Sequence, residues 1–289
     1  MVETKTILVS GVTGQQGSAV ARSLNTRGHR VRGLTRNPDR MKELEARGIE
    51  PVRGDLTDPS SLARALRGVD GFFVVTTPFG PNFSVDVETE VRQGTTAIDA
   101  ASAARVPHLV LASVASADRN TGIPHFESKA QIERHLGGSG LPHTVTRPVA
   151  FMDTYAGWWM GAAVQSGTLA LGLPQEYRLQ MVAVKDIGEI VARAFGSPER
   201  AVGRTVEIAG DAVSMGELAR MFSEKLGRSI RYVELPDEEV LKTMGEDGAR
   251  MLRWFRDEGF HVDIPALESE WGHPMTRFDE FLRTAKFDG

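Results

Sequence analysis

The sequence predicts an α/β fold in which a doubly wound parallel sheet is followed by a smaller C-terminal α+β lobe. Short apolar runs alternate with helical patterns over the first half of the 289 residues, and a glycine-rich turn lies between the first run and the first helix. Such alternation is typical of right-handed βαβ units and of a Rossmann sheet. The pattern loosens after Pro148. We therefore expect a sheet domain at 1–150 and a smaller lobe at 151–289, interleaved with the sheet.

Six strands are expected in the sheet domain, each a short run of branched or aromatic residues. They lie at 6–10, 29–36, 51–54, 71–76, 108–113 and 143–147. The helices between them are expected at 18–24, at 38–47, up to 67, at 85–105 and at 126–136. Asn37 is the expected N-cap of the second helix, and the segment 55–59 caps the third.

The smaller lobe is expected to hold further short elements. These are a helix ending near 195, a strand at 204–208, a helix at 214–226, a strand at 230–233 and a helical remainder. Ser214 is followed three residues later by Glu217, a spacing that predicts a capping box. We expect this lobe to face a substrate or a partner at the carboxyl ends of the sheet.

Composition excludes several classes of function. The net charge of −4 disfavours a general nucleic-acid surface, and the absence of cysteine excludes disulfides, thiolate metal sites and thiol nucleophiles. His261 and His273 have no second ligand at metal spacing, so no metal site is expected. Met1 leads almost directly into the first strand, and no apolar run approaches the roughly 18 residues of a membrane span. We therefore expect a soluble, cytoplasmic protein.

Three glycines mark the first strand-to-helix junction. Gly11, Gly14 and Gly17 follow the strand at 6–10 directly and lead into the first helix. They allow a tight turn and let a pyrophosphate approach the backbone N–H groups at the helix N-terminus. We predict a dinucleotide site here; the alternative is a purely structural turn.

The end of the second strand indicates which dinucleotide is bound. Sites that prefer NAD commonly carry Asp or Glu there to hold the ribose hydroxyls. Arg36 occupies that position instead. Its guanidinium can form charge-assisted bonds to a 2′-phosphate, so we predict NADP(H) rather than NAD(H). The alternative is an arginine that only contacts solvent.

The chain resembles the NmrA-like proteins, atypical relatives of the short-chain dehydrogenases, over essentially its whole length. The resemblance is carried by the Gly-x-Thr-Gly-x-x-Gly motif and by four further segments. These lie at 11–17, 35–38, 54–56, 125–129 and 147–153. The element His125-Phe126-x-x-Lys129 is the most specific, because it separates this group from ordinary reductases. The NADPH-sensor type of the family is the nearest likeness.

This resemblance implies a set of NADP(H)-binding residues. They are Gly11, Thr13, Gly14, Gln15, Gln16, Gly17, Arg36, Asn37, Arg40, Asp55, Leu56, Thr76, Thr77, Arg92, Lys129, Phe151 and Asp153. Two departures from the family pattern matter. Asp153-Thr154 stands where many relatives have Glu-Asn, which puts a polar contact in doubt. Arg92 stands where sensor-type relatives carry Lys, which keeps the charge and changes the geometry.

Candidate catalytic residues are His125, Lys129 and Ser113. Ordinary short-chain dehydrogenases use Tyr-x-x-x-Lys, and this chain has His125 at the tyrosine position with Lys129 retained. Histidine can donate a proton near neutral pH, although His125 could equally pack or cap a helix start. Ser113 ends the fifth strand, where a serine could polarise a carbonyl, and the loop 113–117 is a candidate wall of the site. Lys129 is expected to bond the nicotinamide ribose.

An aromatic cluster follows the sixth strand. Tyr155, Trp158, Trp159 and Met160 lie on a predicted helical stretch. They could form an aromatic substrate pocket, or they could pack the smaller lobe against the sheet.

Three functions fit these residues. One is an NADPH-dependent reductase of a small aromatic or unsaturated molecule; another is a non-catalytic NADP(H) sensor that binds a protein partner. A third, an epimerase or dehydratase, would want the missing tyrosine. We favour the reductase, because an aromatic lobe fits a small substrate at least as well as a protein partner. No membrane and no direct nucleic-acid partner is expected, and the sequence leaves a homodimer open.

Overall fold

The computed structural model describes residues 3–80, 84–156, 164 and 166–285. The chain divides into two compact units. The first combines Met1–Asn120, Pro124–Arg147 and Ile187–Glu207, and the second combines Thr121–Ile123, Pro148–Asp186 and Ile208–Gly289. This differs from the expected division at residue 150, because a segment from beyond residue 186 returns to complete the sheet of the first unit.

The first unit is built on a seven-stranded sheet. In spatial order the strands are β10 (Thr205–Ile208), β6 (His143–Pro148), β5 (Leu109–Ala112), β4 (Gly71–Val74), β1 (Thr6–Val9), β2 (Arg30–Thr35) and β3 (Glu50–Arg53). The pairs from β3 to β6 are parallel. The six expected strands are all present. The seventh, β10, was expected as a strand of the smaller lobe, and the structure places it beside β6.

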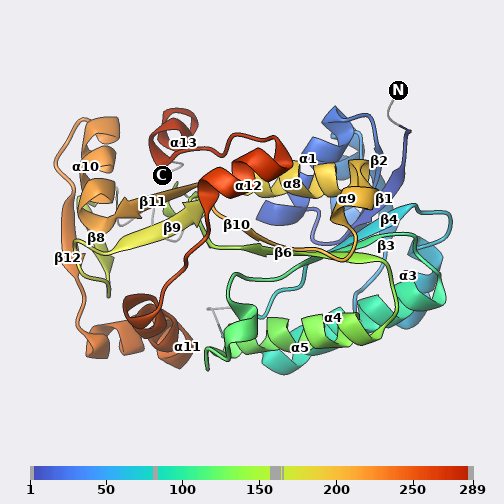
Figure 1. Cartoon of the computed structure of the whole chain (residues 1–289), viewed down its shortest axis with the longest axis horizontal. Helices are drawn as coiled ribbons and strands as arrows, with labels where there is room; N and C mark the ends of the chain where they lie inside the picture. The colour runs from blue at the N-terminus through green and yellow to red at the C-terminus, as the bar shows by residue number, and fades with distance from the viewer. Residues whose placement is uncertain (1–2, 81–83, 157–163, 165, 286–289) are drawn as a thin grey trace. The chain divides into compact units, whose positions relative to one another are not determined.

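Helices cover both faces of this sheet. They are α1 (Gln15–Thr26), α2 (Met41–Ala46), α3 (Pro59–Ala65), α4 (Val87–Ala103), α5 (Pro124–Gly138), α8 (Val184–Gly196) and α9 (Pro198–Ala201). Figure 1 shows α3, α4 and α5 on one face and α1 and α8 on the other. The central strands are therefore buried on both sides, and Leu8, Phe72 and Leu109 are fully inaccessible to solvent. Each such side chain contributes about 1.5–3 kcal/mol through burial.

The helix expected at 38–47 is divided in the structure. A 3-10 turn, η1 (Pro38–Arg40), precedes the short helix α2. The Asn37 Oδ1 accepts the backbone N–H of Asp39 at 2.9 Å, so Asn37 caps the 3-10 turn rather than an α-helix. The cap was correctly placed, but the tighter turn moves the start of the α-helix to Met41.

The second unit contains two small sheets and several helices. One sheet has the order β11 (Asp211–Ser214), β9 (Arg178–Val182) and β7 (Ala150–Phe151); the other pairs β12 (Arg231–Glu234) with β8 (Thr168–Leu171). The helices are α6 (Asp153–Ala156), α10 (Met215–Leu226), α11 (Asp237–Asp257), α12 (Ile264–Trp271) and α13 (Phe278–Thr284). The predicted capping box is confirmed: Ser214 Oγ accepts the Glu217 N–H, and Glu217 accepts the Ser214 N–H.

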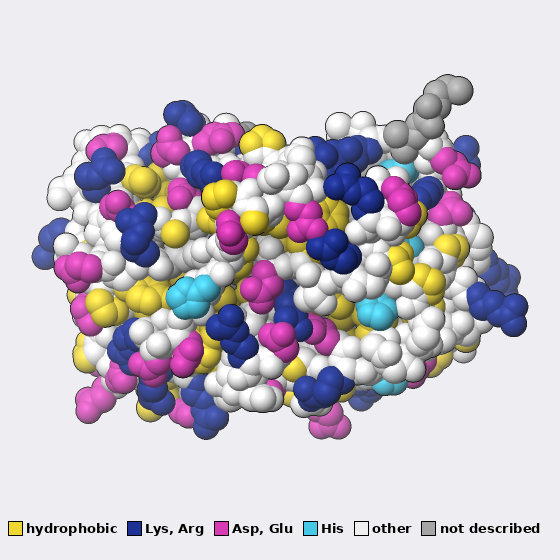
Figure 2. Space-filling model, in the orientation of Figure 1, with side chains coloured by type: hydrophobic (Ala, Val, Ile, Leu, Met, Phe, Trp, Pro, Cys, Tyr) yellow, Lys and Arg dark blue, Asp and Glu magenta, His cyan; other side chains and the backbone are white. Residues whose placement is uncertain are grey.

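The described residues contain neither a membrane-spanning helix nor a metal-binding cluster. No helix among them is long and apolar enough to cross a membrane. Within the same residues, no three His, Asp or Glu side chains gather where they could hold a metal ion. On the face shown in Figure 2, Lys and Arg side chains are interspersed with Asp and Glu, so neither sign of charge dominates that face.

Candidate functional site

The glycine turn joins the end of β1 to the start of α1. Gly11 has φ +57°, and a Cβ there would lie 2.6 Å from the Val75 Cγ1. A Cβ on Gly17 would lie 2.2 Å from the carbonyl oxygen of Gly11. Both positions therefore require glycine, Gly11 for its conformation and Gly17 for the close approach of the helix to the turn.

The N-terminus of α1 is suited to an anion. Its N-cap, Gly14, has no side chain to bond the first N–H groups, and the first turn carries no acidic residue. Thr13, Gly14 and Gln15 are exposed. Gln16 has a buried Oε1 with no hydrogen-bond partner among the described residues. An uncapped helix start with an unpaired buried acceptor fits a ligand that brings negative charge and hydrogen-bond donors, as a dinucleotide does.

The structure brings Arg36, Asp55 and Arg92 together at the carboxyl edge of the sheet. The Arg36 side chain is 76% exposed, with its Nη1 3.9 Å from the Asp55 Oδ2. Burial tends to raise the pKa of Asp55, but bonds from Thr57 and the charges of Arg36 and Arg92 lower it below its usual value. The Asp55 carboxylate thus stays charged between two cations.

Four other predicted cofactor-binding residues lie near this edge in the sequence, and Arg40 and Asn37 among them already bond other groups of the protein. Arg40 pairs with Glu43 at 2.6 Å, and Asn37 caps η1 as described. Leu56 is half-buried beside Asp55 in the chain, and Thr77 is exposed.

Lys129 lies in a buried cluster with Thr76 and Glu90. Its Nζ is 2.8 Å from the Glu90 Oε1, 2.8 Å from the Thr76 Oγ1 and 3.2 Å from the Thr76 carbonyl oxygen. The Glu90 carboxylate is fully buried and also accepts the hydroxyls of Thr76 and Ser128. An ammonium has three N–H donors, so all three of Lys129 are engaged within the protein. Its expected bond to a ribose stays a prediction.

His125 is half-buried in the first turn of α5. Its ring centroid lies 5.4 Å from that of Phe79 and 4.8 Å from that of Phe126. The Phe126 ring is buried in the core, while Phe79 is 45% exposed. His125 therefore connects the core to an exposed aromatic ring in the loop that follows β4.

Ser113 belongs to an ionic network behind the loop 113–117. Its hydroxyl donates to Glu133, and Glu133 forms a bidentate pair with Arg147 at 3.0 and 2.6 Å. Arg147 also contacts Asp118 at 2.9 Å. Burial tends to lower the pKa of Arg147, but Glu133 and Asp118 raise it above its usual value. The network orders the loop, and the Ser113 hydroxyl proton is directed at Glu133.

The remaining predicted residues lie in the second unit. Phe151 is half-buried in β7. The Asp153 Oδ2 accepts the backbone N–H of Val184 at 2.8 Å, and burial raises the pKa of Asp153. Tyr155 is buried edge-on against Phe278. Trp158, Trp159 and Met160 lie outside the described residues.

Sequence reasoning missed Glu90, Glu133 and Phe79. A signal for Glu90 existed. It shares one face of α4 with Gly94, Ala97, Ile98 and Ala101, all buried, so a carboxylate at that position requires an internal partner. Glu133 and Phe79 carry no comparable signal, because their contacts depend on how distant segments meet.

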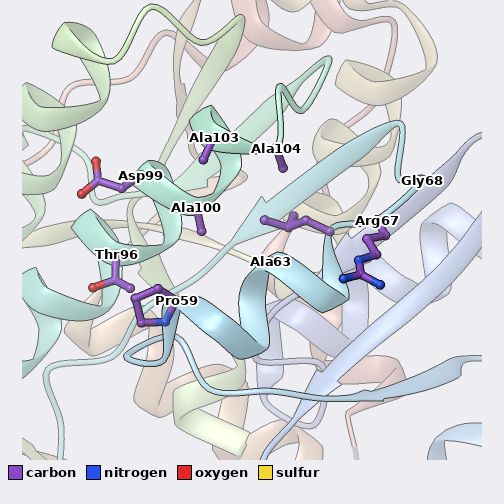
Figure 3. A pocket seen from close by; sticks show the side chains of 10 residues that line it. Pro59, Ala63, Arg67, Gly68, Thr96, Asp99, Ala100, Ala103 and Ala104 are labelled. Carbon is purple, nitrogen blue, oxygen red and sulfur yellow. The ribbon is translucent and has the colours of Figure 1, made fainter.

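A groove of about 710 Å3 lies elsewhere in the first unit, between α3 and α4 (Figure 3). It is lined mainly by small side chains, with Arg67 and Asp99 among them. The lining residues are Pro59, Ala63, Leu66, Arg67, Gly68, Thr96, Asp99, Ala100, Ala103 and Ala104. None of these belongs to the predicted cofactor set, so the groove is separate from the glycine turn.

Known proteins resemble this chain in sequence and in fold. The sequence pattern of the NmrA-like family matches residues 3–282. An NmrA-like family domain-containing oxidoreductase of Aspergillus japonicus is 30% identical over 270 residues, covering 86% of this chain and 81% of that protein. A solved NADPH-dependent quinone oxidoreductase of Escherichia coli, complexed with NADPH, has a TM-score of 0.81 at 24% identity, covering 96% of this chain and 98% of that one. NmrA, a negative transcriptional regulator solved with NADP, has a TM-score of 0.75 at 19% identity, covering 97% and 95%.

Proposed function

Because the chain belongs to the NmrA-like family, we propose that it is an NADPH-dependent reductase of small, flat, unsaturated molecules, with quinones as the first class to test. The family comprises NAD(P)H-dependent oxidoreductases, among them a quinone oxidoreductase of Escherichia coli that is 26% identical over 286 residues. The observation that carries the choice of cofactor is Arg36, exposed at the end of β2 where an acidic residue would favour NAD.

The residues present fit an NADP(H) molecule. The uncapped start of α1 and the glycine turn would hold the pyrophosphate, and the unpaired Gln16 Oε1 would accept a ribose hydroxyl or an amide. Arg36 would bind the 2′-phosphate, with Arg92 adding positive charge nearby. When bound, NADPH supplies a hydride, and a quinone that accepts this hydride together with one proton leaves as a hydroquinone.

In this proposal the chain itself contributes a proton donor and two loops that buried ion pairs hold in place. His125 is half-buried at the start of α5 and packs against Phe79, and in this proposal its imidazole passes a proton to the substrate's carbonyl oxygen. The buried Lys129–Glu90 pair fixes Thr76 and so the loop after β4. The Arg147 network fixes the loop after β5. These two loops flank the carboxyl edge at which ligands bind in open α/β sheets.

A substrate panel with the His125→Ala variant tests the proposal. NADPH oxidation is followed with quinones, azo compounds, aldehydes and enones. We expect quinone turnover, reduced by about 10²–10⁴-fold in His125→Ala, the usual worth of a positioned general acid. His135→Ala is the matched control, since His135 lies on the same helix and bonds the exposed Asp99. Full activity of His125→Ala would assign the proton to solvent.

A non-catalytic NADP(H) sensor is the second candidate. It is favoured by the replacement of the usual tyrosine with His125 and by the internal use of all three Lys129 donors. In that case NADPH would bind tightly, and no member of the panel would be reduced.

A further inference from the structure

We infer that the exposed ring of Phe79, packed beside His125, is the surface on which the flat face of the substrate stacks. This inference rests on the proposed function, since it names the part of the site that selects planar molecules.

Phe79 follows the strand that borders the reversal in strand order. The sheet runs β5-β4-β1-β2, so the chain order reverses between β4 and β1, and ligands of open α/β sheets bind outside the carboxyl ends at such a point. The Val75 N–H donates to Ser10 Oγ at 2.8 Å, which ties the end of β4 to the turn after β1. Phe79 is four residues beyond Val75, and the Thr77 hydroxyl accepts its N–H at 3.2 Å.

The exposure of Phe79 sets it apart from the other large apolar side chains. Phe72, Phe73 and Phe126 are essentially inaccessible, whereas Phe79 is 45% exposed. In the described part of the chain, the other large hydrophobic side chains with comparable exposure are aliphatic: Val202, Val233 and Leu241. An aromatic ring left open at a ligand edge offers apolar area that a ligand can cover.

The ring is open without being loose. Its centroid is 5.4 Å from that of His125 at an interplanar angle of 52°, and His125 meets the buried Phe126 edge-on. The backbone around Phe79 is held as well. Phe79 forms an isolated antiparallel β-bridge with Val85, and the Gly80 N–H donates to the Ser84 carbonyl oxygen at 2.8 Å. A ring fixed in this way loses little conformational freedom when a ligand stacks on it.

The chemistry selects conjugated rings. Aromatic faces attract flat π-systems in offset or tilted arrangements beyond the gain from area alone. A saturated ring of the same size covers similar area but lacks this term. Phe79 should therefore discriminate between planar and saturated forms of one carbon skeleton, and it does so next to the imidazole that is the candidate proton donor.

Ligand binding to the NADP+-loaded protein tests the inference without requiring turnover. Calorimetry compares naphthol with decahydronaphthol, its saturated counterpart, in the unmodified protein, Phe79→Leu, Phe79→Trp and the control Val202→Ala. Phe79→Leu should weaken naphthol binding about threefold to tenfold and change decahydronaphthol binding less than about twofold. Phe79→Trp should retain naphthol affinity, and Val202→Ala should change neither.

Three results would overturn the inference: no naphthol binding to the unmodified protein, equal weakening of both ligands in Phe79→Leu, or unchanged naphthol affinity in that variant. Naphthoquinone turnover then separates the two proposals. If binding depends on Phe79 and naphthoquinone is reduced, KM should rise in Phe79→Leu by the same factor with kcat nearly constant. If binding depends on Phe79 and no member of the substrate panel is reduced, the aromatic surface stands and the reductase proposal fails.

Discussion

Two cationic side chains at the carboxyl edge of the sheet, Lys129 and Arg36, differ in how much of their bonding capacity the protein already uses. Lys129 is buried and engages all three donors with Thr76 and Glu90. Arg36 is mostly exposed and approaches a single carboxylate, that of Asp55, at 3.9 Å. A cation whose hydrogen-bond donors are all used within the protein helps to fix the shape of the site. A cation whose donors are exposed can bind a ligand.

This contrast predicts different readouts for the two residues. Substitutions at Lys129 should appear first in the free energy of unfolding, and those at Arg36 first in the affinity for one cofactor over the other. The glycine turn between them should affect all dinucleotides alike.

The largest effect is expected at Gly14. Its φ of −92° is accessible to any residue, and a Cβ there would lie 3.3 Å from the Gly11 carbonyl oxygen, so Gly14→Val requires only a small shift of the turn. The branched side chain would cover the turn that receives the pyrophosphate. We expect binding of NADPH and NADH to fall below detection while the far-UV circular dichroism spectrum is unchanged. Retained binding in the folded variant would place the cofactor elsewhere.

Lys129→Met should destabilise the fold by about 3–5 kcal/mol, because it leaves the buried Glu90 carboxylate without its cation. Adding Glu90→Gln should recover part of this loss. Urea unfolding measures both, with Arg36→Ala as the control that should change stability by less than about 0.5 kcal/mol. If Lys129→Met were as stable as the unmodified protein, the ion pair would not be holding the site.

Arg36→Ala should reduce NADPH affinity by about ten- to several-hundredfold and leave NADH affinity nearly unchanged, since one or two charge-assisted bonds are worth about 1.5–3 kcal/mol each. Arg30→Ala is the matched control, because Arg30 is exposed at the other end of the same strand. Equal affinity of the unmodified protein for both cofactors in calorimetry would contradict the prediction.

The smallest effect is expected at His108, a buried histidine with an unpaired ring nitrogen, just before the start of β5. Burial, followed by the charges of Lys5 and His143, lowers the pKa of His108 to about 4, and its Nδ1 has no partner among the described residues. The unfolded chain protonates near pH 6.5, so the stability from neutral His108 is present above that pH and is lost as the pH falls toward 4. At pH 5 the loss is about 2 kcal/mol.

The His108→Gln variant isolates this contribution. The difference in unfolding free energy between pH 7 and pH 5 should shrink by about 2 kcal/mol in the variant. Some loss should persist, because burial also lowers the pKa of His29. An unaltered pH dependence would show that His108 does not titrate in this range.

What the sequence could predict was local. The six strands, the capping box at Ser214 and the glycine turn each depend on residues that are close together in the sequence, and each is present in the structure. The fold class followed from the alternation of strands and helices, and the family from the short segments at 11–17, 35–38, 54–56, 125–129 and 147–153. Arg36 is exposed after β2, which fits both a ligand-binding arginine and one that only contacts solvent, so its role stays a prediction.

What the sequence could not predict depends on distant segments. Thr205–Ile208 joins the sheet beside β6 although more than 50 residues separate the two strands. The sequence of this strand does not indicate which strand it pairs with. The same holds for the internal partners of Lys129 and Ser113. The spacing His-Phe-x-x-Lys predicts that Lys129 lies on a helix, but the carboxylate that pairs with it, Glu90, comes from another helix.

The late arrival of β10 has a consequence for synthesis of the chain. Until residues near 205 leave the ribosome, β6 is the outer strand of the growing sheet, with its backbone groups unpaired on one side. In the finished protein the Val145 N–H donates to the Arg204 carbonyl oxygen, and the His143 carbonyl oxygen accepts the Gly203 N–H. The segment Pro148–Asp186 of the second unit is made during this interval, while the nascent sheet still offers an edge to other chains. Shortening the gene after residue 150 would make that interval permanent. A fragment that contains every residue of the glycine turn should therefore aggregate rather than bind a dinucleotide.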